Sequence, residues 1–240
     1  MVLLLAVEGV GDTLQLGQLL RQALAFGLIG PGFGAAAPVR GGKIPTCPYA
    51  GDVDLVTEAR ALAAALLAEQ LPRRWSHVQA VGTKAAQVSA VLEGSDQSVL
   101  VAAAWLHDIG YAPPLADTGF HPLDGGRWLR SQGFDDRVAR LVAHHTCALL
   151  EADERGLAED LTTEFEREES ATADALWYCD ATTGPDGQDL DVLDRLNEIR
   201  ARYGPNTIVT RFIDRAEPQI VAAVQRTRKR LADVGPDHPM

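Results

Sequence analysis

The segment that decides the fold reads Trp105-Leu106-His107-Asp108-Ile109-Gly110. It closes an unbroken apolar run, Val99 to Leu106, which is long enough for two helical turns. A run without polar residues predicts a helix that is buried on all sides. A carboxylate at the end of such a helix is costly to desolvate unless a positive group meets it. Gly110 predicts that the chain then leaves the helix through a left-handed turn.

A divalent metal would meet the His107-Asp108 pair, because neutral imidazole and carboxylate are usual metal ligands. Taken alone, the pair is also compatible with a buried hydrogen-bonded pair that holds no metal. Two ligands do not hold a metal ion, so the interpretation depends on further ligands elsewhere in the chain.

Composition sets the broad class of the chain. Its 240 residues are 46% hydrophobic, which allows one well-packed domain with additional segments. The formal net charge of −11 argues against a nucleic acid polymer or an anionic membrane as the main partner. Between Glu151 and Asp174 there are ten acidic residues and two arginines. This stretch predicts a solvated surface rather than a calcium site, because it lacks the ligand spacing of a calcium loop.

Cysteine usage and the apolar segments indicate the compartment. Cys47, Cys147 and Cys179 show no CxxC spacing, which favours a reducing compartment without a disulfide framework. The apolar N-terminal stretch has no preceding positive charge, and no stretch approaches the roughly twenty apolar residues of a membrane span. We therefore expect a soluble, cytoplasmic protein.

The hydrophobic periodicity predicts an all-α fold. Apolar spacing and capping residues predict helices over 52–70, 73–92, 97–108, 121–132, 135–149, 172–181, 192–203 and 206–234. Pro218 is expected to kink the last helix. The expected domains are a helical bundle over residues 51–240 and a poorly ordered N-terminal arm over residues 1–50. An alternative for the arm is a translation start further downstream, near Val39 or Val53.

Histidines recur in the predicted helices. The chain contains His77, His107, His121, His144, His145 and His238. Apart from His238 in the tail, each lies in or at the start of a predicted helix, so these side chains must converge in space, as metal ligands do in the cores of helical bundles. Asp180, in Trp177-Tyr178-Cys179-Asp180, ends another apolar helical segment and is a further candidate ligand. Because neighbouring residues on a helix point about 100° apart, the sequence leaves open which of His144 and His145 is a ligand.

This order of residues resembles the HD-domain superfamily of metal-dependent phosphohydrolases. Residue by residue, the ligand set of that superfamily falls on His77, His107, Asp108 and Asp180. The later histidines, His121 and one of His144 and His145, resemble the two-metal branch, which includes HD-GYP phosphodiesterases and HD-type dinucleoside-polyphosphate hydrolases. In that branch the aspartate of the pair bridges two metals. The chain departs from HD-GYP proteins because no Gly-Tyr-Pro signature follows His144-His145-Thr146.

The resemblance implies an HD-domain helical bundle that binds one or two divalent metal ions per chain. The ligand types suit iron, manganese, nickel, cobalt or zinc. The implied function is hydrolysis of a phosphate ester or anhydride of a small molecule, with a nucleotide as the expected substrate and with water activated by the metal that Asp108 holds. Candidate cationic contacts to this substrate are Arg73, Arg74, Lys84 and Arg127.

Two other functions fit the same ligand pattern. The scaffold also resembles mixed-valent di-iron oxygenases, which cleave carbon–carbon or carbon–phosphorus bonds. The other alternative is a non-catalytic regulatory module that retains its metal site. The sequence leaves the oligomeric state open, with a homodimer as one assembly.

Overall fold

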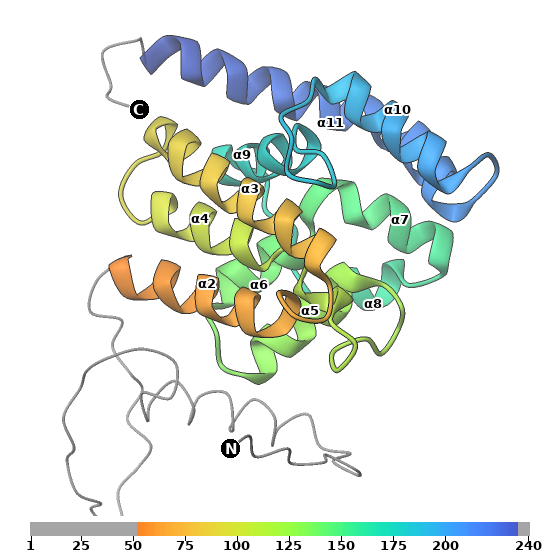
Figure 1. Cartoon of the computed structure of the whole chain (residues 1–240), viewed down its shortest axis with the longest axis horizontal. Coiled ribbons are helices and arrows are strands. Elements are labelled where there is room, and N and C mark those ends of the chain that lie inside the picture. Colours follow the sequence, from red (N-terminus) through yellow and green to blue (C-terminus); the bar gives the residue numbers. More distant parts are fainter. Residues whose placement is uncertain (1–51, 235–240) are drawn as a thin grey trace, which may run out of the picture. The chain divides into compact units, whose positions relative to one another are not determined.

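Helix α4 (Asp96–Leu106) lies at the centre of the computed structural model, which describes residues 52–234 (Figure 1). Every residue from Ser98 to Leu106 is buried, as the apolar run predicts. Helices α2 (Asp52–Leu67), α3 (Pro72–Val88), α6 (Asp136–Ala143) and α9 (Ala171–Ala181) pack against α4. A helix enclosed in this way has no polar face, which explains the unbroken apolar sequence.

The remaining helices complete the bundle around this centre. They are α5 (His121–Ser131), α7 (Ala148–Arg155), α8 (Ala158–Glu164), α10 (Val192–Tyr203) and α11 (Ile208–Val234). Three short 3-10 helices connect them, and these are η1 (Ser89–Val91), η2 (Ile109–Tyr111) and η3 (His145–Cys147). The all-α prediction is confirmed, since residues 52–234 contain only one isolated β-bridge, between Thr183 and Asp189.

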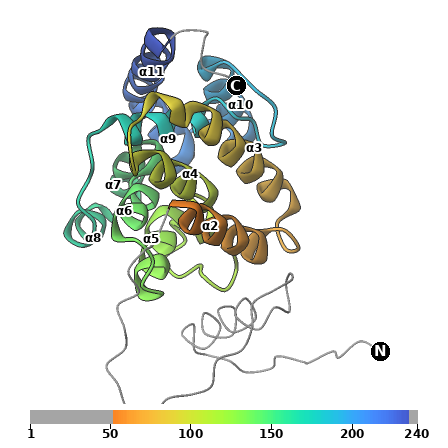
Figure 2. The ribbon, with the colours of Figure 1, turned by 90° about the vertical axis from the view of Figure 1, so that its left-hand side faces the viewer.

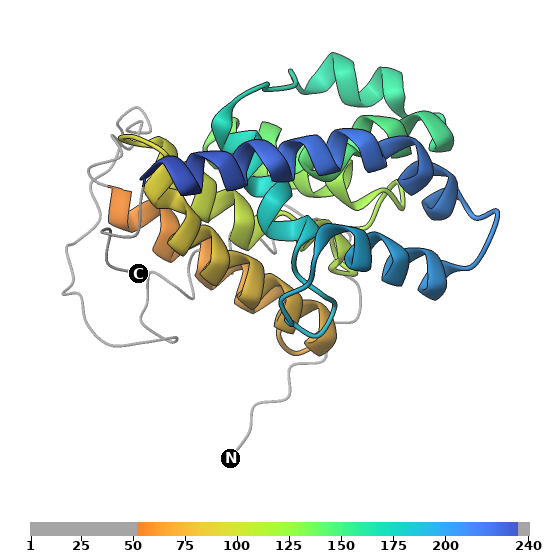
Figure 3. The same cartoon turned by 90° about the horizontal axis from the view of Figure 1, so that it is seen from above.

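Helices α10 and α11 form a hairpin at one end of the bundle. The two helices run side by side, and α11 crosses over α9 and α7 (Figure 3). Figure 2 shows this hairpin and α2 at opposite ends of the described part of the chain. Helix α11 contains Pro218 and runs as one helix. The hairpin thus covers the end of the bundle at which α9 finishes.

Close packing of α3 against α4 depends on Gly82. A Cβ atom at this position would lie 2.5 Å from the indole ring of Trp105, so a larger residue would push the two helices apart. This contact keeps His77, earlier on α3, close to the end of α4.

The predicted helix over 135–149 is wrong as a single element. The structure divides it into α6, η3 and α7, because Thr146 and Cys147 adopt left-handed backbone angles with φ of 45° and 61°. Apolar periodicity continues through this break, so the sequence pattern does not show it. The left-handed exit at Gly110 is also wrong, since the chain continues there into η2 and Gly110 is not among the glycines with positive φ.

Other predictions fall outside the described residues or are met in part. The N-terminal arm, the alternative start at Val39, and Cys47 and His238 lie outside residues 52–234. The acidic stretch is helical in α7 and α8 and extended before α9. Cys147 and Cys179 are free thiols and are buried. No helix in the part of the chain that is described is long and apolar enough to cross a bilayer.

Arg137 on α6 joins two segments that support the centre of the fold. Its guanidinium donates to Asp96 at the start of α4, at 2.7 Å, and to Glu168 just before α9, at 2.8 Å. Thr172, which is buried in the first turn of α9, donates to the same Asp96 carboxylate. The hydrogen bonds from Arg137 hold the pKa of Asp96 and of Glu168 below their usual values.

Replacing Arg137 with Gln should therefore destabilise the fold in a pH-dependent way. At pH 7 we expect a loss of about 1–2 kcal/mol in the free energy of unfolding, because the two carboxylates lose a charged donor. Since the folded-state pKa values are lowered, this stabilisation is present above the unfolded-state values of about 3.9 and 4.3 and disappears as pH falls through the folded-state values. Urea unfolding between pH 7 and pH 3 measures the difference.

Arg140→Gln on the same helix is the control, because Arg140 pairs with the exposed carboxylates of Asp136 and Glu166. We expect it to change stability by less than about 0.5 kcal/mol. An equal loss in both variants, or a loss in Arg137→Gln that does not depend on pH, would contradict this account.

Candidate metal centre

The predicted ligands come from five separate segments and meet at one end of α4. His77 is on α3, and His107 and Asp108 follow the last residue of α4. His121 is the first residue of α5, and Asp180 lies in the last turn of α9. The remaining ligand, a histidine of η3, is described below. All of these side chains are buried or nearly so.

Backbone carbonyl groups orient three of the imidazole rings. The Nδ1 atom of His77 lies 3.0 Å from the carbonyl oxygen of Gly184. The Nδ1 atoms of His107 and His145 lie 2.8 and 2.6 Å from the carbonyl oxygens of residues 104 and 142, one turn earlier in the chain. A carbonyl only accepts, so each Nδ1 carries a proton, and in the neutral ring each Nε2 is left with its lone pair. This is the tautomer that binds a metal through Nε2, with the other ring nitrogen held by a hydrogen bond.

The first group of ligand atoms belongs to His77, His107 and Asp180. These atoms lie within 4.8 Å of one another. The two Nε2 atoms are 3.3 Å apart, and Nε2 of His77 lies 3.2 Å from Oδ1 of Asp180. Two lone pairs that face each other in a buried site repel unless a cation lies between them, so this geometry fits a bound metal.

The second group belongs to Asp108, His121 and His145, again with ligand atoms within 4.8 Å of one another. Nε2 of His121 lies 3.3 Å from Oδ1 of Asp108 and 3.2 Å from Nε2 of His145. The other oxygen of Asp108, Oδ2, lies 3.4 Å from Nε2 of His107 in the first group. Each oxygen of Asp108 therefore faces one group, so Asp108 could be shared between metal ions that the two groups would hold.

The protonation of the site shows that it favours positive charge. Burial alone would lower the pKa of His107, but the adjacent Asp108 carboxylate raises it to about 9. Burial alone would raise the pKa of Asp108, but Arg74 and His107 hold it well below its usual range. By contrast, burial lowers the pKa of His121 to about 3. The buried carboxylates of Asp108 and Asp180 thus favour a proton on His107 when no stronger cation is bound. The nitrogen and oxygen ligands of the site fit divalent metal ions.

Gly110 allows the second group to form. A Cβ atom at this position would lie 2.0 Å from the backbone carbonyl oxygen of His121 and 2.8 Å from the backbone nitrogen of Gly125. The glycine is thus needed for a close approach of η2 to the start of α5, and not for backbone freedom. It holds His121 within reach of Asp108.

Tyr111 lies between a ligand and a cation. Its ring stacks on the ring of His121, with centroids 3.9 Å apart, and the guanidinium of Arg74 lies 4.0 Å from the Tyr111 ring centroid. Nη1 of Arg74 also donates to Oδ2 of Asp108 at 2.8 Å. Burial alone would lower the pKa of Arg74, but the Asp108 carboxylate raises it, so Arg74 stays a cation beside the site.

A cavity of about 270 Å³ opens from the two groups toward the α10–α11 hairpin. Its lining includes ligands from both groups and four arginines, and these arginines are Arg74, Arg155, Arg195 and Arg202. The hairpin contributes an apolar wall, made by Leu196, Ile199, Val209, Phe212 and Ile213. The cavity therefore offers cations near the ligand groups and apolar surface further out.

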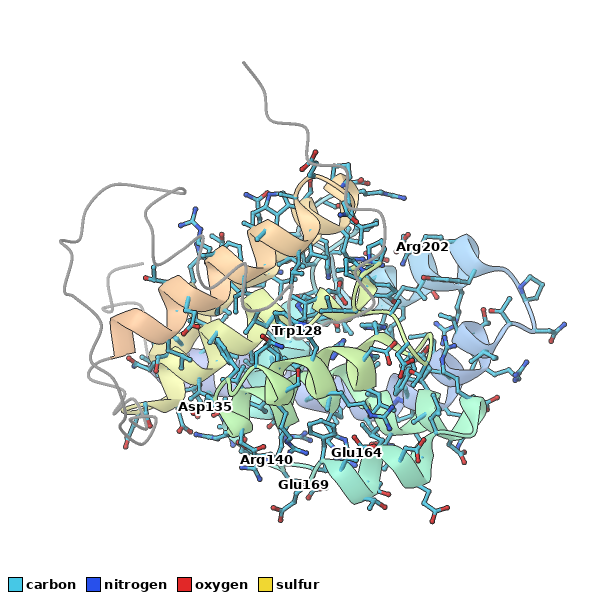
Figure 4. The ribbon with its side chains drawn as sticks, turned by 90° about the horizontal axis from the view of Figure 1, so that it is seen from below. Trp128, Asp135, Arg140, Glu164, Glu169 and Arg202 are labelled. Atoms are coloured by element: carbon cyan, nitrogen blue, oxygen red, sulfur yellow. The ribbon has the colours of Figure 1, made fainter. Side chains whose placement is uncertain are left out.

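The structure does not bring every candidate residue to this site. His144 lies outside both groups, because its Nε2 donates to the carbonyl oxygen of Phe165 at 2.7 Å, whereas His145 faces the ligands. Lys84 donates to Thr182 at the end of α9 and pairs with Asp189, Arg127 pairs with Glu164, and Arg73 pairs with Asp186 outside the cavity. In Figure 4, Glu164 of α8 lies well away from α10, where Arg202 is labelled. Neither Lys84 nor Arg127 lines the cavity.

Sequence reasoning missed several residues of the site. Tyr111 directly follows the glycine of the His-Asp segment, and this adjacency is a usable signal. The hydroxyl of Thr146 donates to Asp180, but the sequence carries no signal for this residue. The helix break that turns it inward is not visible in the apolar periodicity. Arg195 could have been found, since it falls at helical spacing on the apolar face formed by Val192 and Leu196.

The all-helical fold and the two groups of histidine and aspartate ligands define a class of helical domains with a candidate metal centre. A family model described as the HD domain matches residues 74–199. The chain therefore belongs to the HD-domain family, as the order of histidines and aspartates predicted. No curated protein and no solved structure matches it significantly.

The pair of adjacent histidines allows a direct test of the ligand set. We expect metal analysis of protein purified without chelator to find about two metals per wild-type chain, and about one in His145→Ala, because that group loses a ligand. His144→Ala should keep the wild-type content and lose about 1 kcal/mol of stability, since the Phe165 carbonyl loses its donor. The reverse pattern would make His144 the ligand.

Gly110→Ala should disrupt the second ligand group, because the added methyl group would push η2 away from the start of α5. The methyl group meets backbone atoms that cannot move independently, so we expect a loss of about 2–4 kcal/mol in stability and a reduced metal content. Gly125→Ala is a graded comparison, because its Cβ would meet the backbone nitrogen of Gly110 at 3.3 Å rather than a carbonyl oxygen at 2.0 Å, so we expect a smaller loss. Thermal unfolding and metal analysis of both variants check this, and a Gly110→Ala protein with normal metal content would contradict it.

Proposed function

We propose that this chain hydrolyses a phosphate ester or anhydride of a small phosphorylated molecule. The observation that carries the proposal is the placement of two ligand groups, joined by Asp108, beside a cavity that four arginines line. Phosphoryl transfer requires positive charge around the phosphoryl oxygens more than it requires a particular nucleophilic side chain.

The residues that would hold the metals are those of the two groups, with Asp108 shared between them. A bound divalent metal supplies a Lewis acid for phosphoryl oxygens and lowers the pKa of coordinated water. The chain itself supplies orientation. The carbonyl groups that hold the Nδ1 atoms of His77 and His107 keep each ring aimed inward.

Arg74 is the chain's own cation at the reacting centre. Its contact with Asp108 uses one of its five N–H donors, so the guanidinium can also bind a phosphoryl oxygen in the cavity. Stacking of Tyr111 between Arg74 and His121 limits the positions that both side chains can adopt. Arg74 would thereby stabilise charge that builds up on the phosphoryl group.

A nucleotide suits the outer part of the cavity. Tyr203 and Phe212 line it beside the arginines and can stack on a base. The same wall would also accept another apolar group, so this support is for a phosphorylated molecule with a ring or hydrocarbon part.

A di-iron oxygenase is the second candidate, because paired groups of nitrogen and oxygen ligands also suit iron. The arginine-lined cavity favours the phosphohydrolase, since four cations are more useful for a phosphorylated substrate than for oxygen chemistry. Incubation with a panel of nucleoside mono-, di- and triphosphates and simple phosphomonoesters, with and without chelator, tests the proposal. Release of phosphate that chelator abolishes supports it. Oxygen consumption by an iron-loaded protein without phosphate release would contradict it and favour the oxygenase.

Arg74→Gln tests the role of the chain's own residues on the best substrate of the panel. We expect kcat/KM to fall by about 10²–10³, because a charge-assisted contact to the phosphoryl group is lost. Arg73→Gln is a matched control, since Arg73 is the adjacent residue, is largely exposed and pairs with Asp186 outside the cavity. Equal kinetic losses in the two variants would show that Arg74 has no special role.

A further inference from the structure

Two arginines on α10 lie in the same cavity as the ligand groups but come from a different part of the fold. Arg195 and Arg202 line the cavity from the α10–α11 hairpin, whereas Arg74 lines it from α3 beside Asp108. Figure 4 shows Arg202 on the α10 side of the molecule. The HD-domain match ends at residue 199, so Arg202 and all of α11 lie beyond it.

Arg195 is a buried cation with an unused donor. Only 5% of its surface is exposed, and its Nε is buried without a hydrogen-bond partner among the described residues. Its Nη1 donates to Glu198. The residue lines the cavity, so donors of its guanidinium other than the buried Nε can serve a ligand that enters there.

Glu198 does not compensate both arginines. Nε of Arg202 lies 3.4 Å from the carboxylate of Glu198, the same group that accepts from Arg195. Two guanidinium groups thus share one carboxylate at the wall of the cavity. On α10 the two guanidinium groups therefore exceed the carboxylate by one positive charge, whereas Arg155 is paired with Glu151, which also lines the cavity.

We propose that Arg195 and Arg202 bind a second anionic group of the substrate, a phosphate or carboxylate other than the reacting phosphate. This inference rests on the proposed function, since Arg74 and the ligand groups take the reacting phosphate. Carbon atoms between the two anionic groups would lie against Leu196 and Phe212, which line the same cavity. The substrate class is therefore a small phosphorylated compound with two anionic ends.

Comparing the affinities of two phosphonates of equal chain length tests whether the protein binds a second anionic group. Propylphosphonate carries one anionic group, and 3-phosphonopropionate adds a carboxylate at the other end. Isothermal titration of the metal-containing protein should show that 3-phosphonopropionate binds at least about 10-fold more tightly, because a charge-assisted contact is gained. Phosphonates are not hydrolysed, so the readout does not depend on turnover.

Arginine variants on the same helix locate the effect. Arg202→Gln should remove most of the preference for 3-phosphonopropionate and leave the affinity for propylphosphonate unchanged, while Arg202→Lys should keep part of the preference. Arg195→Gln should behave like Arg202→Gln if it folds. Arg200→Gln is the matched control, because Arg200 pairs with Asp214 and Glu217 of α11 and does not line the cavity. It should keep the full preference.

Three results would overturn the inference. These are equal affinities of the wild type for the two phosphonates, an equal loss of both affinities in Arg202→Gln, and a loss of preference in Arg200→Gln as large as that in Arg202→Gln. If the wild type hydrolyses members of the phosphate panel but shows no preference between the phosphonates, only this inference fails. If it binds neither phosphonate and releases no phosphate from the panel, the proposed function fails as well.

Discussion

The repulsion among buried lone pairs and carboxylates at the end of α4 is the constraint on which this structure depends. In the neutral rings, imidazole nitrogens that carry no proton face one another at 3.2 and 3.3 Å, and Asp108 and Asp180 add negative charge beside them. Such a cluster is unfavourable by itself, so the fold must hold it together from outside. Within residues 52–234, two kinds of contact hold the cluster together. Backbone carbonyl groups fix the Nδ1 protons of the imidazole rings, and Arg74 pairs with Asp108.

Two local backbone features serve the same purpose. Gly110 removes the side chain that would keep η2 away from α5, and the left-handed angles of Thr146 and Cys147 turn His145 toward His121. A left-handed β-branched residue is strained, and that strain is tolerated because the hydroxyl of Thr146 then reaches Asp180. Backbone strain and a missing side chain are thus concentrated where ligands from distant segments must meet.

The helices and the order of ligands could be predicted from the sequence, whereas the local backbone features could not. The buried α4, the helices around it and the ligand order follow from apolar periodicity and from the family resemblance, and the structure brings His77, His107 and Asp180 together. The helix break after His144 was not predictable, because left-handed angles at Thr146 leave no trace in apolar spacing. Lys84 was selected for its spacing from His77, but its ammonium group donates to Thr182 at the C-terminal end of α9 instead. Spacing on one helix cannot show which neighbouring helix a long side chain meets.

The cavity arginines come from different parts of the fold, and this difference indicates which part determines the reaction and which part determines the substrate. Arg74 lies on α3, inside the segment that matches the HD domain, and is tied to Asp108. Arg202 and the apolar residues of α11 lie outside that segment, on a hairpin that packs against α9 without supplying any member of the two ligand groups. Changes in the hairpin can therefore alter the cavity wall while the ligand groups keep their geometry. The chemistry would then belong to the helices around α4, and the choice of substrate to α10 and α11.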